Sequence, residues 1–121
     1  MYSGPVVTGP RTILVVDDEP SLRLLCRVNL ELDGHRVLEA ATLAEARSHL
    51  ASEAVDVILL DVHVGSEHGL ELIGEARPAR VVLLTGSAEI DEQTRSVVEA
   101  VLGKPFALDD LAAAVAADPV Q

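Results

Sequence analysis

Ile13–Asp18 reads ILVVDD, and Val57–Asp61 repeats the pattern as VILLD. Each stretch is a short run of Val, Ile and Leu that ends in carboxylates. Such runs are typical of strands buried on both faces of a parallel sheet, and α/β proteins bind ligands at the carboxyl ends of such strands. The two stretches therefore predict an acidic site at one edge of a parallel sheet.

Around these stretches, strand-like and helix-like segments alternate along the whole chain. Pro20 stands where a first helical residue would, and Thr42-Leu43-Ala44-Glu45 matches a capping box that opens a helix. The strands are expected at Thr12–Val16, Arg36–Ala40, Val55–Leu60, Arg80–Leu84 and Ala100–Leu102, and the helices at about 20–33, 43–52, 70–76, 89–98 and 108–117. Strict alternation predicts an α/β fold with a single doubly wound five-stranded parallel sheet and helices on both faces.

Length and composition limit the function classes. A chain of 121 residues with 49% hydrophobic content fits one domain with a closed core. Aromatic residues make up only 2%, which argues against base stacking and flavin binding, and a net charge of -11 opposes direct contact with nucleic acid. No apolar run approaches the length of a bilayer span, so no membrane association is expected.

The domain organisation is expected to be simple. Residues 1–11 contain two Gly-Pro breaks and are interpreted as a flexible N-terminal leader. Residues 12–117 form the folded domain, and residues 118–121 form a short tail. The leader has no basic n-region and no apolar h-region, and with a single cysteine in the chain this indicates a reducing, cytoplasmic location.

The acidic edge carries the expected chemistry. If the first and third strands lie side by side, Asp17, Asp18 and Asp61 converge, and carboxylates so close repel one another unless a cation lies between them. Mg²⁺ suits such a site because it prefers carboxylate and carbonyl oxygens and leaves positions open for phosphate oxygens. Lys104, the only lysine in the chain, and the Thr85 hydroxyl end later strands and are expected to contact phosphoryl oxygens.

Other candidate groups have plainer interpretations. The four histidines, including His63, show no spacing typical of metal ligands among themselves or with the single cysteine, Cys26. Cys26 lies in an apolar helical pattern, so we expect a buried packing residue rather than a reactive thiol. Each aspartate taken alone would be an ordinary strand end or helix cap, and only their combination with Lys104 indicates a site.

Four short motifs carry a family resemblance: Val16-Asp17-Asp18-Glu19, Leu60-Asp61-Val62, Leu84-Thr85-Gly86 and Gly103-Lys104-Pro105-Phe106. In this order, each closing an apolar strand, they resemble the receiver domain of bacterial two-component response regulators. The resemblance spans residues 12 to about 117 and implies the flavodoxin-like form of the expected fold.

The resemblance also implies roles for individual residues. Asp61 would accept a phosphoryl group from a histidine kinase or a phosphotransfer protein, while Asp17, Asp18, Asp61 and the main-chain carbonyl of His63 would bind Mg²⁺. Thr85 and Lys104 would sense the acyl phosphate, and the Lys104-Pro105 peptide would be cis. Such a domain catalyses only its own phosphorylation and dephosphorylation, and it signals by changing its affinity for a downstream effector protein.

Departures from the family pattern keep other functions open. Val101 occupies a position at which the family commonly has an aromatic residue, and the stretch from Asp61 to Thr85 is short, so the third and fourth helices are expected to be shortened. One alternative is a pseudo-receiver, an interaction module that switches weakly or not at all. Another is a small Mg²⁺-dependent phosphohydrolase with Asp61 as its nucleophile.

Overall fold

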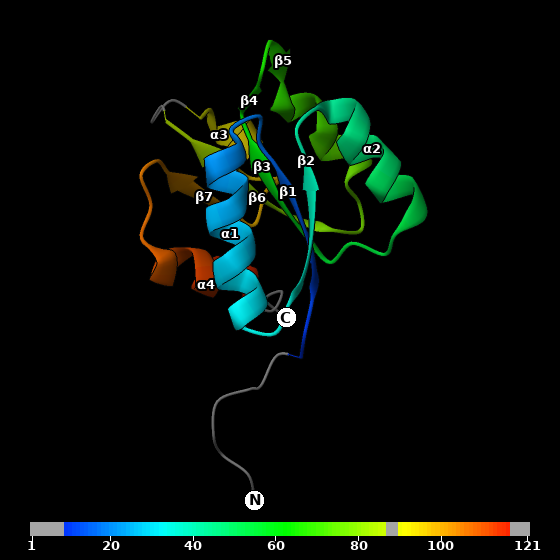
Figure 1. Cartoon of the computed structure of the whole chain (residues 1–121). Helices are drawn as coiled ribbons and strands as arrows, with labels where there is room; N and C mark the ends of the chain where they lie inside the picture. The colour runs from blue at the N-terminus through cyan, green and yellow to red at the C-terminus, as the bar shows by residue number, and fades with distance from the viewer. Residues whose placement is uncertain (1–8, 87–89, 117–121) are drawn as a thin grey trace, which may run out of the picture.

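The computed structural model describes residues 9–86 and 90–116, so most of the expected leader and the whole expected tail lie outside the described residues. Strands and helices alternate along the chain (Figure 1). The strands of the main sheet are β1 (Thr12–Val16), β2 (Arg36–Ala40), β3 (Val57–Asp61), β6 (Arg80–Thr85) and β7 (Ala100–Gly103). The helical elements are α1 (Pro20–Leu32), α2 (Leu43–Ser52), the 3₁₀ helix η1 (Gly69–Glu75), α3 (Glu92–Arg95) and α4 (Leu108–Ala116).

The main sheet has five strands in the order β2-β1-β3-β6-β7, and every pair of neighbours is parallel. The chain thus starts near the centre and winds outward in both directions, which confirms the predicted doubly wound sheet. Val16 of β1 pairs with Leu60 of β3. This register brings the carboxylates that follow the two apolar runs to the same edge of the sheet.

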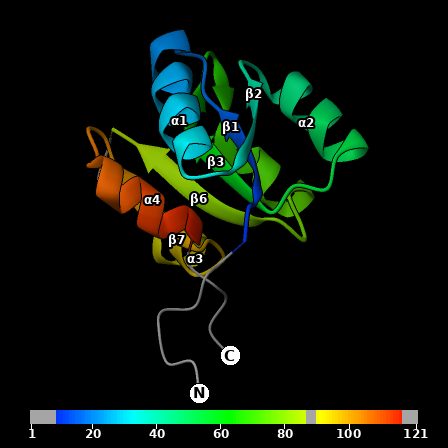
Figure 2. The same cartoon turned by 60° about the horizontal axis from the view of Figure 1, so that its bottom comes forward.

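Alternating side chains of the central strands build two separate cores. In β3, for example, Val57 and Leu59 point to one face while Ile58 and Leu60 point to the other, and all four are buried. Helices α1 and α4 cover the first face, whereas α2 and η1 cover the second (Figure 2). Burial on both faces is the reason why these strands are continuous apolar runs.

The helix starts expected at Pro20 and Thr42 are confirmed. The Thr42 hydroxyl accepts a hydrogen bond from the Glu45 N–H at 3.1 Å, and the Glu45 carboxylate accepts one from the Ala41 N–H at 2.8 Å. The first bond satisfies a main-chain donor that the first turn of a helix leaves open, and the second holds the residue before the N-cap against the same turn. Pro20 begins α1, where its lack of an N–H costs nothing.

Helix α1 buries a different stripe from the one its leucines suggest. Cys26 and Leu30 are buried against the sheet, as expected for Cys26. The apolar side chains Leu24, Leu25, Val28 and Leu32 are instead 58%, 44%, 47% and 79% exposed. Helix α1 therefore carries an apolar outer face.

None of the helices within residues 9–86 and 90–116 combines the length and apolar character that a membrane span requires.

The segment after Asp61 differs from the simple loop predicted from the sequence. Strands β4 (His63–Val64) and β5 (Glu67–His68) form a small antiparallel hairpin, whose turn includes Gly65 at φ +62°. This left-handed conformation strains residues that carry a Cβ atom. The buried Val64 side chain anchors the hairpin to the core.

The expected shortening of the third and fourth helices is confirmed. A single 3₁₀ segment, η1, takes the place of the third helix. It ends before Arg77, because a residue that precedes a proline, here Pro78, disfavours helical backbone angles. The helix expected at 89–98 is only the four-residue α3; position 89 itself lies outside the described residues. The Glu99 N–H donates to the carbonyl of Val81 at 2.7 Å, so the chain must already be extended there.

Gly69 sets how closely the hairpin returns to β3. A Cβ atom at this position would overlap the main-chain carbonyl oxygen of Asp61 and lie 3.3 Å from a methyl group of Leu60. We expect Gly69→Ala to lower the free energy of unfolding by about 1–3 kcal/mol, because backbone atoms would have to move. Urea denaturation measures this change.

Gly74→Ala is the matched control, because a Cβ atom at Gly74 meets no heavy atom within 4 Å. Its free energy of unfolding should stay within about 0.5 kcal/mol of the parent value. Equal effects of the two substitutions would show that close packing against Asp61 does not constrain position 69.

Candidate functional site

The site begins with the ends of two neighbouring strands. Asp17 directly follows β1, and Asp61 is the last residue of β3. Asp17 is 1% exposed and Asp61 7% exposed, whereas Asp18 is open to solvent. Each of the three aspartates offers a carboxylate oxygen within 4.8 Å of the others. The structure thus brings together the carboxylates predicted to converge.

Lys104, the residue that follows β7, completes this cluster from the other side of β3. Its Nζ atom donates to Asp61 Oδ2 at 2.7 Å and to Asp17 Oδ2 at 2.9 Å. Its main-chain N–H donates to the carbonyl of Thr85 at 2.7 Å, which extends the pairing of β6 and β7 by one residue. The Lys104-Pro105 peptide is cis, as the resemblance implied.

Main-chain donors hold the other carboxylate oxygens of the cluster. The Glu19 N–H donates to Asp17 Oδ1 at 2.9 Å, and the His63 N–H donates to Asp61 Oδ1 at 3.1 Å. Both carboxylates are therefore oriented from two sides. The contact from His63 comes from its main-chain nitrogen, and metal binding by its main-chain carbonyl stays a prediction.

Thr85 lies at the same edge of the sheet. It is the last residue of β6, is 3% exposed, and pairs with Gly103, the residue before Lys104. All six sequence-predicted site residues thus lie at the same edge of the sheet, at or shortly after the carboxyl ends of its strands. His63 is exposed, in β4 of the hairpin.

The electrostatics of the cluster follow from its partial burial. Burial raises the pKa of Asp17 most strongly; hydrogen bonds from the Glu19 N–H and Lys104 oppose this rise, and the nearby Asp61 adds to it. For Lys104, burial alone would lower the pKa, but the hydrogen bonds to Asp61 and Asp17 outweigh it, so the pKa of Lys104 is raised. Lys104 therefore stays a cation at neutral pH.

The donor set fits a hard divalent cation. When all groups are ionised, three carboxylates and one ammonium leave an excess of two negative charges, which a divalent ion would balance. Carboxylate oxygens are the ligands that Mg²⁺ and Ca²⁺ prefer, and the exposed Asp18 leaves the cluster open to solvent on one side. The cluster is therefore a candidate metal site.

Arg23 supports the site, and the sequence analysis did not identify it. Its Nη1 atom donates to the main-chain carbonyl of Asp17 at 2.6 Å, and its Nε atom donates to Glu39 Oε1 at 3.1 Å. Arg23 thus ties the turn after β1 to β2. Its position one turn into α1 was the available signal, but the contact with β2 depends on the tertiary structure.

Cys26 lies outside the candidate chemistry, as the sequence predicted. Its side chain is buried, and burial, followed by the nearby charge of Asp17, raises the pKa of the thiol to about 11. Because the thiolate is the reactive form, this thiol is nearly inert at neutral pH.

Comparison with known proteins agrees with the family resemblance of the sequence motifs. The family model described as "Response regulator receiver domain" matches residues 13–116. The KDP operon transcriptional regulatory protein KdpE of Escherichia coli (strain K12) is 32% identical over 107 residues, which cover 84% of this chain and 48% of KdpE. The chain spans about half the length of the first curated relatives that it matches.

Two solved structures also resemble the chain and hold ligands. A response regulator from Burkholderia pseudomallei, solved with a phosphorylated aspartic acid, calcium ion and citrate, is 30% identical with a TM-score of 0.77, covering 87% of this chain and 66% of its own. The response regulator TrrA from Thermotoga maritima, solved with Mg²⁺-BeF, is 31% identical with a TM-score of 0.75, covering 84% and 93%.

The buried carboxylate of Asp17 should destabilise the metal-free fold. A carboxyl group whose folded pKa lies above its unfolded pKa destabilises the folded state when ionised, and this cost disappears only as the pH falls below both values. We therefore expect Asp17→Asn, at pH 7 with chelator, to raise the midpoint of thermal unfolding. Addition of Mg²⁺ should stabilise the parent chain and leave the variant nearly unchanged, because bound ligand stabilises the folded state by mass action.

Asp33→Asn is the control, since it removes one negative charge at the exposed end of α1. It should keep the response to Mg²⁺. A stabilising effect of Mg²⁺ on Asp17→Asn equal to that on the parent chain would contradict the metal assignment.

Proposed function

The chain belongs to the response regulator receiver domain family, and on this premise we propose that it is a phosphoryl-accepting switch of a two-component phosphorelay. Asp61 would take a phosphoryl group from a histidine kinase or a phosphotransfer protein, with Mg²⁺ as cofactor. The observation that carries the proposal is the position of Lys104, whose Nζ atom bridges Asp17 and Asp61 at 2.9 and 2.7 Å beside the exposed Asp18.

The reaction would use groups that are already oriented. A carboxylate oxygen of Asp61 would form a bond to phosphorus while the bond from phosphorus to the donor's imidazole nitrogen breaks, and the electron pair would leave with that nitrogen. No general base is needed, because a carboxylate nucleophile has no proton to lose when it attacks. Most of the protein's task in phosphoryl transfer is to position groups and stabilise charge.

Each neighbour of Asp61 would have a distinct part. Lys104 would stay positively charged beside the added phosphoryl group, because its own pKa is raised. The Thr85 hydroxyl, at the same strand edge, would donate to a phosphoryl oxygen. Asp17, Asp18 and Asp61, with the main-chain carbonyl of His63, would hold Mg²⁺. Mg²⁺, when bound, would offset the repulsion between the incoming phosphoryl oxygens and the carboxylates.

The acyl phosphate would shift a conformational equilibrium and thereby change affinity for an effector protein. A signal from Thr85 would pass to the neighbouring strand β7, where Val101 packs partly buried against the core cluster that contains Leu83. A valine has no ring to rotate between buried and exposed positions. We therefore expect the change in affinity for the effector to depend on the backbone of β7. A cytoplasmic location, domain limits of 12–117 and the absence of direct contact with nucleic acid belong to this proposal.

Mass spectrometry of the intact chain tests phosphorylation. Incubation with acetyl phosphate and Mg²⁺ should add one phosphoryl group, and hydroxylamine should remove it, because the adduct is an acyl phosphate. Asp61→Asn and chelation of the metal should each abolish the addition, since they remove the nucleophile or the charge compensation. Asp33→Asn, outside the cluster, should be modified like the parent chain.

A parent chain that stays unmodified under these conditions would favour the pseudo-receiver, an interaction module without phosphoryl switching. Release of inorganic phosphate from varied phosphate esters, with turnover dependent on Asp61, would favour the phosphohydrolase instead.

We also propose where a phosphoryl donor docks. Next to Lys104, a cavity of about 370 Å³ is lined by Leu22 and Leu25 of α1 and by Pro105 and Phe106 of the following loop. Leu25 is 44% exposed, so the outer face of α1 presents apolar surface beside the acidic cluster. A protein that delivers a phosphoryl group to Asp61 must cover this edge, and apolar contacts would hold it there.

Leu25→Asp should therefore slow phosphoryl transfer from an autophosphorylated histidine kinase by about tenfold or more, because it places a charge in the apolar core of the interface. Modification by acetyl phosphate, which needs no docking surface, should be unchanged. Leu32→Asp is the matched control, since Leu32 lies at the far end of the same helix and is 79% exposed. Equal transfer to both variants would refute this docking surface.

A further inference from the structure

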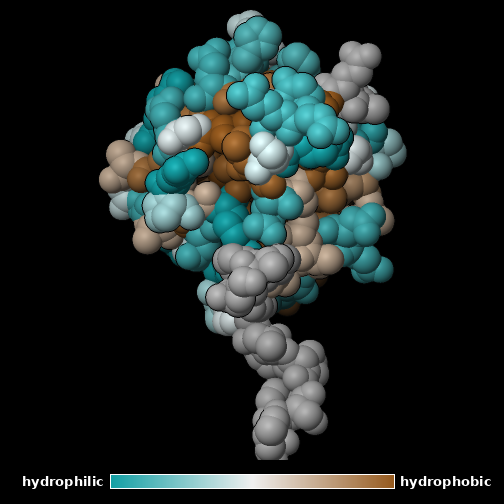
Figure 3. Space-filling model, turned by 180° about the vertical axis from the view of Figure 1, so that it is seen from behind, coloured by the Kyte–Doolittle hydropathy of each residue, from teal (hydrophilic) through white to brown (hydrophobic). Residues whose placement is uncertain are grey.

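The shortened third and fourth helices leave a hollow over one face of the sheet. From behind, the molecule shows apolar atoms lying open between polar margins (Figure 3). On this face, opposite α1, a cavity of about 490 Å³ lies between η1 and the segment that joins α3 to β7. Its lining includes Ile73, Ala79, Val81, Val97 and Val98. This volume falls within the range of small-molecule sites.

The apolar wall combines a buried floor with an open rim. Val81 is 5% exposed and forms part of the core, whereas Val97 is 55% exposed. Ile73 and Val98 are partly buried against the same core cluster. A ligand with an apolar body would remove the exposed part of this wall from water, which is favourable in proportion to the apolar area covered.

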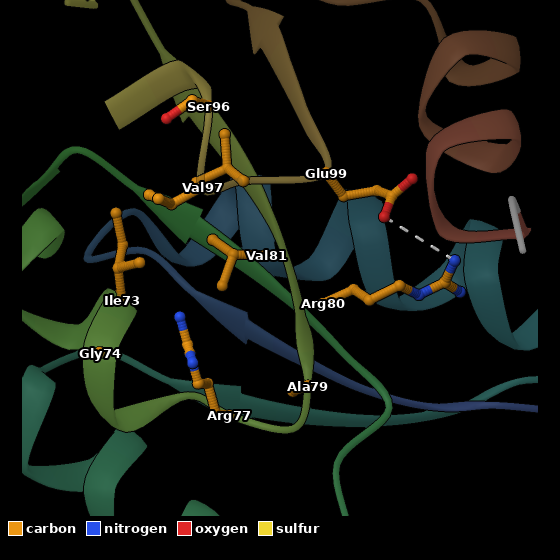
Figure 4. A pocket seen from close by; sticks show the side chains of 10 residues that line it. Ile73, Gly74, Arg77, Ala79, Arg80, Val81, Ser96, Val97 and Glu99 are labelled. Atoms are coloured by element: carbon orange, nitrogen blue, oxygen red, sulfur yellow. Dashed lines mark ion pairs between the residues drawn. The ribbon is translucent and has the colours of Figure 1, made fainter. Parts of the chain in front are cut away.

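One cation points into this cavity. The guanidinium group of Arg77 is directed toward the space between Ile73, Val81 and Val97 (Figure 4). Within residues 9–86 and 90–116, no carboxylate forms an ion pair with Arg77. Two carboxylates near Arg77 have other partners. Glu75 pairs with Arg47 at 3.0 Å, and Glu99, which itself lines the cavity, pairs with Arg80 at 4.0 Å. Arg77 is thus available to an anion in a chain whose net charge is -11.

These features indicate which chemical class of ligand fits the cavity. A guanidinium group binds a carboxylate through two parallel hydrogen bonds. The strongly acidic protein would repel a polyanion, so a single negative charge with an apolar body fits best. We propose that this cavity, called here the η1–β7 cavity, is a binding site for an amphipathic monocarboxylate with an aliphatic chain. This function goes beyond the phosphoryl switch and uses none of the residues assigned to it.

The test is a titration of the isotope-labelled full chain, followed by amide NMR signals, with octanoate as the probe. We expect saturable shifts at Gly74, Val81, Val97 and Glu99. Acetate lacks the apolar body and 1-octanol lacks the charge, so each should bind at least about tenfold more weakly, the loss expected when one class of contact is missing.

Two variants should weaken octanoate binding by about tenfold or more. Arg77→Gln removes the cation, and Val97→Glu places a carboxylate at the exposed rim, where it would pair with Arg77 and repel the ligand. Arg95→Gln, which removes an exposed arginine outside the cavity lining, should bind like the parent chain. Because none of these positions is in the acidic cluster, all three variants should still be modified by acetyl phosphate if the parent chain is.

Several results would overturn the proposal. These are the absence of saturable shifts, equal binding of 1-octanol, and unchanged affinity in Arg77→Gln. Shifts at the same residues that depend on protein concentration alone would assign the cavity to contact with a second copy of the chain.

Discussion

Repulsion between converging carboxylates is the constraint under which one edge of this sheet is built. The parallel register of β1 and β3 forces Asp17 and Asp61 to the same edge of the sheet, where both are nearly excluded from water. A single ammonium group, that of Lys104, bridges them. The fold therefore tolerates an arrangement that costs stability, and such a cost is typical of sites kept for function.

The same repulsion explains why several separate segments contribute contacts to this edge. Main-chain donors from Glu19 and His63 fix the carboxylates, and Arg23 fixes the turn that carries Asp17. Gly69 allows the chain after Asp61 to fold back against β3 without displacing it. These contacts come from separate segments, so the geometry of the site depends on the whole α/β framework rather than on any one loop.

The sheet face beside η1 and α3 differs from the well-supported acidic edge. There a 3₁₀ segment and the four-residue α3 stand in place of two full helices, and the strand pairing at Glu99 ends the helical path early. Apolar surface that a longer helix would bury is left exposed at Val97, beside a guanidinium group. The departures from the family pattern thus alter this surface and β7 while the acidic edge keeps its residues.

Sequence patterns alone were enough to predict the element order, the doubly wound sheet and the residues of the acidic edge. They could do so because strands buried on both faces must be continuous apolar runs and because parallel strands place their carboxyl ends together. The packed structure was needed to show that Leu25 and Val28 face outward while Cys26 and Leu30 face the sheet. Helical spacing alone does not show which stripe of an apolar helix meets a neighbour. The packed structure was also needed to show the hairpin after Asp61, the contact of Arg23 with β2 and the direction of Arg77, because these depend on packing between segments far apart in the sequence.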